Sequence, residues 1–597
     1  MTVENCQSSC LPWPEHPRPD FYRDAWQNLN GTWAFDFDEE DKGLAGRWFE
    51  KHEFSRAILV PFCYQSEKSG IHDLKDHEVM WYQRTFKLEK ELQGKRCRLH
   101  FGAVDYEAYV WLDGCYLGTH EGGYTPFSFD ITDVIRHIGE DKTHTLTVRA
   151  VDRLSPTQPR GKQSWLGKPF ECWYTPVSGI WQTVYLEAEG NTAISAIHFT
   201  PDISQGCARS EITLSRIFHG KLAVQVQYQG DSVFACEYEV QGQEQFPLTL
   251  HLSKGDPIEG IHLWRPGHPA LYDVTITLTD PDGGLDTIHT YFGMRDIQVK
   301  NGMIYLNGSV LYQKLVLDQG YWPDTLLTPP DDESLRADVE WALKLGYNGA
   351  RKHQKIELPR YYYWADKLGL LVWGELPSTY RFTSQSQDRL HRDMAEFIRR
   401  DYNHPSLIVW VPLNESWGVR WIGHDQNMQR FADSLYARIK AMDSMRLISN
   451  NDGWEQPNSD IFALHDYTAY GQQLSGMYAT REQVLTCGPM RVRATLAKGY
   501  QDHGQPIILS EYGGIAMSRD AKDNHWGYNG AVDTEENFLA RFENITRALC
   551  AHDYILGYCY TQLTDVFQEV NGLLDMHRNP KVDVDKIRTV NDSIRGI

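Results

Sequence analysis

The sequence predicts a multidomain chain: a jelly-roll β-sandwich, then an immunoglobulin-like β-sandwich, then a (β/α)₈ TIM barrel. Two patterns predict it. Up to about residue 295 the chain consists of short runs of alternating polarity separated by turn residues, which is typical of all-β domains. After about residue 300, apolar runs alternate with helical segments, which favours βα units around a parallel sheet. A length of 597 residues also exceeds that of one ordinary domain.

The first block is predicted to span residues 1–190. Turn pairs such as Asp113-Gly114 separate its alternating runs, and this spacing of short strands is typical of a sandwich or jelly roll. The runs lie at residues 29–37, 81–86, 98–101, 108–112, 145–150 and 181–187.

The second block is predicted to span residues 191–295. Its clearest strand patterns lie at 223–228 and 272–278. About 100 residues is the size of an immunoglobulin-like sandwich, and the cysteine pattern gives no reason to expect the disulfide of that fold.

The third block, residues 296–597, is predicted to be the barrel. Eight strands in about 300 residues is the usual content of this fold. The strands are expected to end near Leu317, Arg351, Glu375, Glu415, Asn450, His465, Glu511 and Gln562. Helical patterns lie at 333–345, 390–401, 426–441 and 535–551.

Two of the predicted barrel strands end in a glutamate. An apolar run over residues 406–413 stops at Asn414-Glu415, and a second run over 506–510 stops at Glu511. Catalytic groups of barrels stand at the carboxyl ends of the strands, and glycoside cleavage needs two carboxyl groups facing one sugar. One glutamate alone is more often part of an ion pair at the rim, whereas the pair favours catalysis. We expect burial and a nearby negative charge to keep the acid protonated, and hydrogen-bond donors to keep its partner ionised.

At these residues the chain resembles glycoside hydrolase family 2, the family of β-galactosidases, β-glucuronidases and β-mannosidases. The run Asn403-His404-Pro405-Ser406, which leads into Asn414-Glu415-Ser416, is the most specific part of the resemblance. The resemblance covers nearly the whole length and includes residues 81–86, 292–295, 348–351 and 510–513.

The resemblance implies that Glu415 is the general acid/base and Glu511 the nucleophile, with retention of anomeric configuration. It implies that Asn414 binds the 2-hydroxyl of the sugar. Tyr467 resembles the tyrosine that holds the nucleophile, and Arg351 resembles an arginine beside it; ordinary packing at the barrel rim is the alternative for both.

Four further residues are candidates for the sugar pocket: His465, Trp417, Trp526 and Gln562. The two tryptophans are equally well interpreted as core or loop anchors, because aromatic side chains serve both sugar stacking and packing.

The chain departs from the family pattern at Asp318-Gln319, His353-Gln354 and Tyr560-Thr561-Gln562. The family uses these positions to contact substrate, so a furanose or pentose (galactofuranose, arabinofuranose or arabinopyranose) remains an alternative to a hexopyranose. Asn579-Pro580-Lys581 has the spelling of the Asn-x-Lys pair that binds the uronate in glucuronidases. We discount it because it falls in the stretch after strand eight.

Composition limits the partners. A formal charge of -21 disfavours nucleic acid and anionic membranes, since both would repel the chain. Eleven cysteines without CxxC pairs indicate neither a zinc site nor a disulfide framework and fit a reducing compartment. The first residues contain no basic or apolar segment, so we expect no secretory signal and a cytoplasmic location. We expect a small carbohydrate as partner, allow for a homo-oligomer, and expect no metal, cofactor or membrane contact.

The sequence therefore predicts a retaining exo-glycosidase that removes terminal non-reducing sugars from oligosaccharides or glycosides. Two alternatives remain open. One is an endo-acting hydrolase on the same barrel, for which an open groove would be the mark. The other is a catalytically silent carbohydrate-binding protein, for which a missing carboxylate would be the mark.

Overall fold

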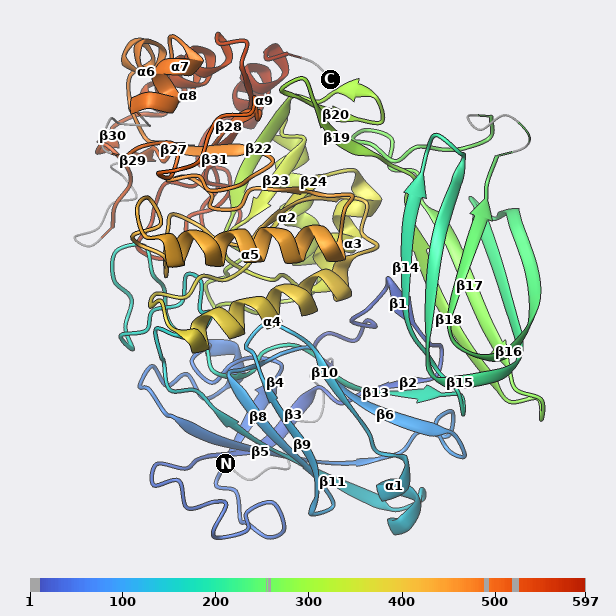
Figure 1. Ribbon diagram of the computed structural model, residues 1–597. Coiled ribbons are helices and arrows are strands. Elements are labelled where there is room, and N and C mark those ends of the chain that lie inside the picture. The colour runs from blue at the N-terminus through green and yellow to red at the C-terminus, as the bar shows by residue number, and fades with distance from the viewer. Residues whose placement is uncertain (1–10, 254, 256–258, 488–492, 518–524, 596–597) are drawn as a thin grey trace.

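The computed structural model describes residues 11–595, apart from 254, 256–258, 488–492 and 518–524 (Figure 1). A β-rich body containing the N-terminal segment lies at the bottom of Figure 1, and a second β-rich body lies at the right. The remaining chain forms a helix-covered parallel sheet above the first body. The order of the three parts along the chain is the one that the sequence predicted.

The first body is a pair of facing antiparallel sheets. Side chains along its strands alternate between buried and exposed, as in β3 (Gly31–Phe37), so each sheet turns its apolar face toward a shared core. One sheet contains β4 (Arg56–Val60), β3, β5 (Val79–Lys87), β11 (Thr143–Val151), β8 (Glu107–Leu112) and β9 (Cys115–Glu121). The other contains β10 (Phe127–Asp130), β6 (Arg96–Phe101), β13 (Val184–Glu189) and β2 (Trp26–Asn28).

The second body is built around the long strand β15 (Cys207–Tyr228). Its first half pairs with β14 (Ile194–Asp202) and its second half with β17 (Tyr272–Thr279). The register shifts between Thr213 and Phe218, so the sheet bends there and folds over its own core. The other strands are β16 (Asp231–His251), β18 (Leu285–Phe292) and, from the N-terminal segment, β1 (Phe21–Tyr22). The proposed boundary at residue 190 falls between β13 and β14.

The third part contains eight parallel strands surrounded by helices. In spatial order the strands are β26 (Leu447–Ile448), β25 (Leu407–Val411), β24 (Leu371–Glu375), β23 (Gly349–Lys352), β22 (Gln313–Asp318), β31 (Ile555–Thr561), β28 (Ile507–Gly513) and β27 (Phe462–Asp466). The helices are α2 (Asp332–Lys344), α3 (Pro359–Leu368), α4 (Ser384–Asp401), α5 (Gln426–Met442), α6 (Gly471–Met477), α7 (Arg481–Cys487), α8 (Glu535–Cys550) and α9 (Val584–Ser593). Nearly every strand residue is buried, as expected for a parallel sheet covered on both faces.

The sheet curls until the segment after its edge strand β26 reaches the other edge strand, β27, at Gly453. The Gly453 N–H donates to the Ala463 carbonyl at 3.1 Å, and the His465 N–H donates to the Gly453 carbonyl at 3.2 Å. Gly453 has φ +93°, and a Cβ there would lie 2.4 Å from the His465 ring. Closure of the barrel therefore requires glycine at this position.

A loop of the first body reaches over the carboxyl ends of the barrel strands. The Arg160 and Gly161 N–H groups both donate to the Ser378 carbonyl, at 3.0 and 3.1 Å. Gly161 has φ +58°, and a Cβ there would lie 2.2 Å from the Gln354 carbonyl oxygen. Glycine thus allows the two backbones to touch, and this contact places the next residues of the loop at the barrel mouth.

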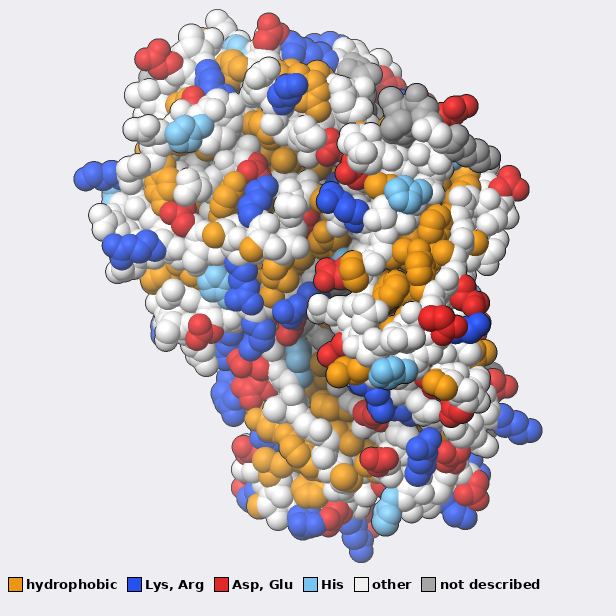
Figure 2. Space-filling view, turned by 45° about the vertical axis from the view of Figure 1, so that its right-hand side comes forward, with side chains coloured by type: hydrophobic (Ala, Val, Ile, Leu, Met, Phe, Trp, Pro, Cys, Tyr) orange, Lys and Arg blue, Asp and Glu red, His pale blue; other side chains and the backbone are white. Residues whose placement is uncertain are grey.

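The surface carries both signs of charge. Figure 2 shows acidic and basic side chains interspersed over one face, which is hollowed near its middle. Among the helices that the structure describes, none has the length and apolar character needed to cross a membrane.

Candidate active site

Glu415 and Glu511 meet at the barrel mouth. Glu511 lies within β28, and Glu415 follows the last residue of β25, Val411, by four positions. A carboxylate oxygen of each glutamate and a ring nitrogen of His465 lie within 4.8 Å of one another. Two segments that are separated by almost 100 residues in the sequence therefore share one site.

A left-handed turn positions Glu415. Glu415 and Ser416 have φ of +49° and +56°, a conformation that non-glycine residues adopt rarely. The Glu415 N–H donates to the Asp452 carbonyl at 2.8 Å, and the Ser416 N–H donates to Asn451 Oδ1 at 3.0 Å. These bonds offset the cost of the strained backbone, which is about 1–3 kcal/mol per residue.

Both oxygens of Glu511 accept hydrogen bonds from fixed donors. Arg351 Nη1 donates to Oε1 at 2.9 Å, and the Tyr467 hydroxyl donates to Oε2. The fully buried Arg351 also donates through Nη2 to Asn414 Oδ1 at 2.6 Å and through Nε to Glu375 Oε2 at 2.9 Å. One guanidinium therefore fixes Glu511 and Asn414 relative to each other.

Glu375 is the neutral member of this cluster. Burial, opposed by Arg351 and reinforced by Asp452 and Glu511, raises the pKa of Glu375 to about 8. Near neutral pH the carboxyl group is mostly protonated, so it adds little negative charge beside Glu511.

Glu415 lies against His465. His465 Nδ1 is 2.8 Å from Glu415 Oε1, and the Trp417 indole N–H donates to Oε2 at 3.2 Å. Burial raises the pKa of Glu415, but the hydrogen bond and charge of His465 outweigh burial, so the pKa lies below its ordinary value. The expectation that Glu415 is kept protonated in the unliganded site is therefore wrong, and the reason is His465.

His465 bridges two carboxylates. Its Nε2 lies 2.8 Å from Asp452 Oδ1, opposite the contact with Glu415. Burial lowers the pKa of His465, but Glu511, Asp452 and Glu415 outweigh burial and raise it to about 10. Glu415 and His465 therefore hold one proton between them near neutral pH, and their titrations are coupled.

The first body supplies part of the mouth, which the sequence analysis missed. The Trp173 indole donates to the Tyr380 hydroxyl at 2.6 Å, and the Trp173 and Trp417 rings meet edge to face at 5.1 Å. Lys162 is buried nearby on the same loop. The available signal was the stretch of about 30 residues between the runs ending at 150 and beginning at 181, because long loops without secondary structure are usually functional.

Residues at the three family departures form one hydrogen-bonded belt. His353 Nδ1 lies 2.9 Å from Gln319 Oε1, Gln319 Nε2 donates to Gln562 Oε1 at 2.9 Å, and Gln562 Nε2 donates to Asn571 Oδ1 at 2.7 Å. At the end of the belt Asn571 Nδ2 donates to Glu569 Oε1 at 3.3 Å. Each side chain of this belt is hydrogen-bonded to the next. The three departures from the family pattern are therefore parts of one connected network.

The hydrogen bonds of Trp526 and Lys581 go to groups other than the two carboxylates. The Trp526 indole donates to the Glu171 carbonyl at 3.1 Å, and its ring packs on Tyr528, which stacks on Tyr467. Lys581 donates to both oxygens of Asp565 and to the Val570 carbonyl. Discounting Asn579-Pro580-Lys581 as a uronate site agrees with this structural use of Lys581.

The donor atoms of Glu415, His465 and Glu511 are close enough together to ligate a metal ion. They do not suit one, because a metal needs a neutral imidazole with a free lone pair. Both nitrogens of His465 already face carboxylates, and its pKa of about 10 favours the protonated ring.

Comparison with protein families identifies all three parts of the chain. Residues 26–186 match "Glycosyl hydrolases family 2, sugar binding domain". Residues 192–295 match "Glycosyl hydrolases family 2", and residues 297–593 match "Glycosyl hydrolases family 2, TIM barrel domain".

Two curated relatives illustrate the range of similar sequences. A β-glucuronidase of Rattus norvegicus is 24% identical over 616 residues, covering 93% of this chain and 88% of the relative. A β-galactosidase of Thermoanaerobacter pseudethanolicus is 25% identical over 454 residues, covering 74% of this chain but only 56% of the relative.

Solved structures show the same architecture. A β-glucuronidase from Ruminococcus gnavus superposes with a TM-score of 0.76 at 19% identity, covering 96% of this chain and 98% of that one. A β-galacturonidase from Eisenbergiella tayi gives 0.75 at 20% identity, covering 98% and 99%. The predicted fold class, a jelly-roll sandwich, an immunoglobulin-like sandwich and a TIM barrel, is confirmed.

Proposed function

The chain belongs to glycoside hydrolase family 2, and from that premise we propose that it is a retaining exo-glycosidase acting on terminal non-reducing sugars. It is a glycoside hydrolase; the retaining mechanism, the exo mode and the roles of the residues are the proposal.

The separation of the two carboxylates is the observation that carries this proposal. Retaining glycosidases place their carboxyl groups about 5–5.5 Å apart, whereas inverting ones need about 6.5–9.5 Å to admit a water molecule. One oxygen of Glu415 and one oxygen of Glu511 lie within 4.8 Å of each other, and so close an approach of the two groups supports retention.

Glu511 is the proposed nucleophile. Its two oxygens are held by Arg351 and Tyr467, so the carboxylate is oriented before substrate arrives. Attack on the anomeric carbon by one oxygen would form a glycosyl ester, and the donor on the other oxygen, Arg351 or Tyr467, would keep its hydrogen bond to the oxygen that remains free. Asn414, fixed by Arg351, is placed to bind the 2-hydroxyl group.

Glu415 is the proposed acid/base. The Glu415–His465 pair holds one proton, which can pass from Nδ1 to Oε1 across 2.8 Å and then to the departing glycosidic oxygen. In the second step Glu415 would take a proton from the attacking water, and His465 would again stabilise the carboxylate.

The first-body loop favours exo over endo action. Trp173, packed on Trp417, and the buried Lys162 stand over one side of the barrel mouth, where an endo-acting enzyme needs room for a continuing chain. A catalytically silent carbohydrate-binding protein would not need two carboxylates at this separation. The alternatives of a furanose or a pentose stay part of the proposal, because the belt through Gln319, His353 and Gln562 replaces residues with which the family contacts its sugar.

Substitution of the nucleophile tests the mechanism. We expect Glu511→Ala to lower kcat on a nitrophenyl glycoside by at least about 10⁴-fold, because no covalent intermediate can form. Azide should restore turnover and yield the glycosyl azide of inverted configuration, identified by NMR. Glu543→Ala, on the exposed surface of α8, is the matched control and should behave as wild type. Rescue that gives the retained azide would contradict the nucleophile assignment.

A further inference from the structure

Lys162 is a buried cation to which no carboxylate among the described residues is bonded. Its side chain is on the first-body loop and is only 7% exposed. In the part of the chain that the structure describes, its ammonium forms no ion pair, and its hydrogen-bond contact is the thiol of Cys172. Lysine is rarely buried to this degree unless it is paired, so the free donors need an explanation.

The charges around Lys162 are those of the active site. Burial lowers the pKa of Lys162, but Cys172 and then three surrounding carboxylates outweigh burial, so the pKa lies above its ordinary value. The carboxylates belong to Glu569, Glu511 and Glu415. Arg351 and His465 differ from Lys162 in that their donors are already committed to protein carboxylates.

Glu569 is a second buried charged group beside the Lys162 loop. It is 2% exposed, and the Tyr174 hydroxyl donates to its Oε2 at 2.6 Å. The ammonium of Lys162 lies 5.5 Å from the centre of the Tyr174 ring, so Tyr174 touches both groups. An ammonium group that only donates and a carboxyl group that accepts are therefore brought together by Tyr174 at the mouth.

The belt orients Glu569 from the nucleophile's side. Asn414 Nδ2 lies 3.3 Å from His353 Nε2, and from His353 the bonds run through Gln319, Gln562 and Asn571 to Glu569. His353 Nε2 also lies 3.5 Å from Glu511 Oε1. The position of Glu569 is thus tied to the group that is proposed to attack the sugar.

We propose that Lys162 and Glu569 are specificity-determining residues that bind neighbouring hydroxyl groups of a neutral sugar and select against uronic acids. This inference rests on the proposed function. A hydroxyl group both donates and accepts, so two adjacent hydroxyls satisfy the ammonium and the carboxylate together. A uronate carboxylate accepts only, so it would satisfy Lys162 but would be repelled by Glu569 nearby.

A panel of 4-nitrophenyl glycosides tests the selectivity directly. It contains neutral pyranosides, furanosides and pentosides together with β-glucuronide and β-galacturonide. We expect the best substrate to be neutral and both uronides to be at least about 100-fold lower in kcat/KM, the discrimination that one mismatched buried charge gives.

Two variants locate the selectivity. Lys162→Met keeps an unbranched apolar side chain without the ammonium and should lower kcat/KM on the best neutral substrate by about 10- to 100-fold, because a charge-assisted hydrogen bond is lost. Glu569→Gln removes the repulsion and should narrow the gap between neutral and uronide substrates by about tenfold. Lys168→Met, on an exposed residue of the same loop, should change neither quantity.

The outcomes separate this inference from the function on which it rests. If no glycoside of either kind is hydrolysed, the proposed function fails. If a uronide is the best substrate, or if Lys162→Met and Lys168→Met are indistinguishable, the neutral-sugar inference is overturned while the glycosidase stands.

Discussion

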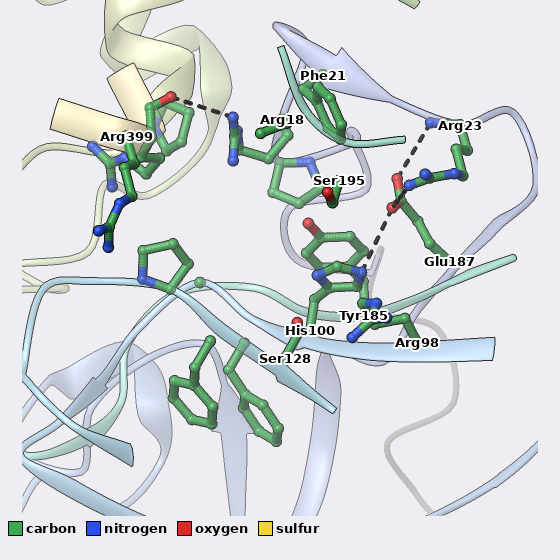
Figure 3. A pocket seen from close by; sticks show the side chains of 18 of the residues that line it. Arg18, Phe21, Arg23, Arg98, His100, Ser128, Tyr185, Glu187, Ser195 and Arg399 are labelled. Atoms are coloured by element: carbon green, nitrogen blue, oxygen red, sulfur yellow. Dashed lines mark hydrogen bonds and ion pairs between the residues drawn. The ribbon is translucent and has the colours of Figure 1, made fainter. Parts of the chain in front are cut away.

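Two buried, charged regions lie where the domains of this chain meet, and they treat their charges differently. One is the barrel mouth. The other is a cavity of about 490 Å³ at the junction of the first body, the second body and α4 (Figure 3). Both draw charged side chains from more than one domain, so burial and charge alone do not tell which is functional.

At the junction cavity the protein neutralises its own charges. Arg23 donates to Glu187 at 3.1 Å and to Asp286 at 2.9 Å, and Arg98 donates to Glu189 at 2.6 Å. Figure 3 shows Arg23 and His100 both facing Glu187. Burial lowers the pKa of His100 to about 3, so its ring is neutral. These contacts tie strands of the first body to β18 of the second.

At the barrel mouth the charges are paired less completely in the part of the chain that the structure describes. Lys162 has no carboxylate bonded to it among the described residues, and Glu415 shares one proton with His465. On the proposed function, hydroxyl groups of the sugar would take up the remaining donors of Lys162. The comparison teaches that the pairing of charges within the protein distinguishes a cavity that joins domains from a cavity that binds substrate.

The largest effect on activity is expected from a substitution at the barrel mouth. We expect Glu415→Ala to lower kcat/KM on substrates with alcohol leaving groups by about 10³- to 10⁴-fold, near the upper limit for general acid catalysis. Dinitrophenyl glycosides need little protonation, so their first step should be nearly unchanged in a burst experiment. Glu396→Ala, which alters the junction cavity, should leave both substrates unaffected. Equal losses on the two substrates would exclude Glu415 as the acid.

Substitutions at the junction cavity should change the stability of the protein and not its activity. Arg23→Met removes the guanidinium that bonds both Glu187 and Asp286, and we expect a loss of about 3–5 kcal/mol in unfolding free energy. Thermal and urea unfolding measure it, and kcat/KM of the folded enzyme should not change. Arg399→Met is the control, because Arg399 borders the same cavity but is exposed, and it should lie within about 0.5 kcal/mol of wild type. Lost activity at unchanged stability would make the junction a functional site.

Much of the fold could be predicted because its signals are local. Strands of a parallel sheet are buried on both faces and appear as continuous apolar runs, so β25 and β28 were found within a few residues of their ends. The same runs located Glu415 and Glu511. The contacts of Tyr467 and Arg351 with Glu511 are those that the resemblance implied.

The rest of the site depends on contacts between distant segments. Lys162 reaches the mouth only because Gly161 lets its loop touch Gln354, and no pattern around Lys162 reports that contact. Glu569 gains its place from Tyr174, which lies 395 residues away in the sequence. The charge of Glu415 was predicted wrongly for the same reason, since the position of His465 against it is a tertiary fact.

The smallest predicted effect is a shift of pH dependence at His465. Leaving-group protonation needs the proton that Glu415 and His465 share, so kcat/KM is retained below the pKa of the pair and lost above it. Because the pKa of His465 is about 10, we expect the alkaline limb of the wild-type profile near that pH.

His465→Gln leaves Glu415 as the sole holder of the proton. Burial then raises the pKa of Glu415 without opposition from an imidazolium, but not to the value of the pair. The alkaline limb should therefore move to lower pH by more than about one unit, which is about tenfold in rate on that limb. His503→Gln, at an exposed histidine away from the mouth, should leave the limb in place. If the limb of His465→Gln coincides with that of wild type, the two groups do not share the proton.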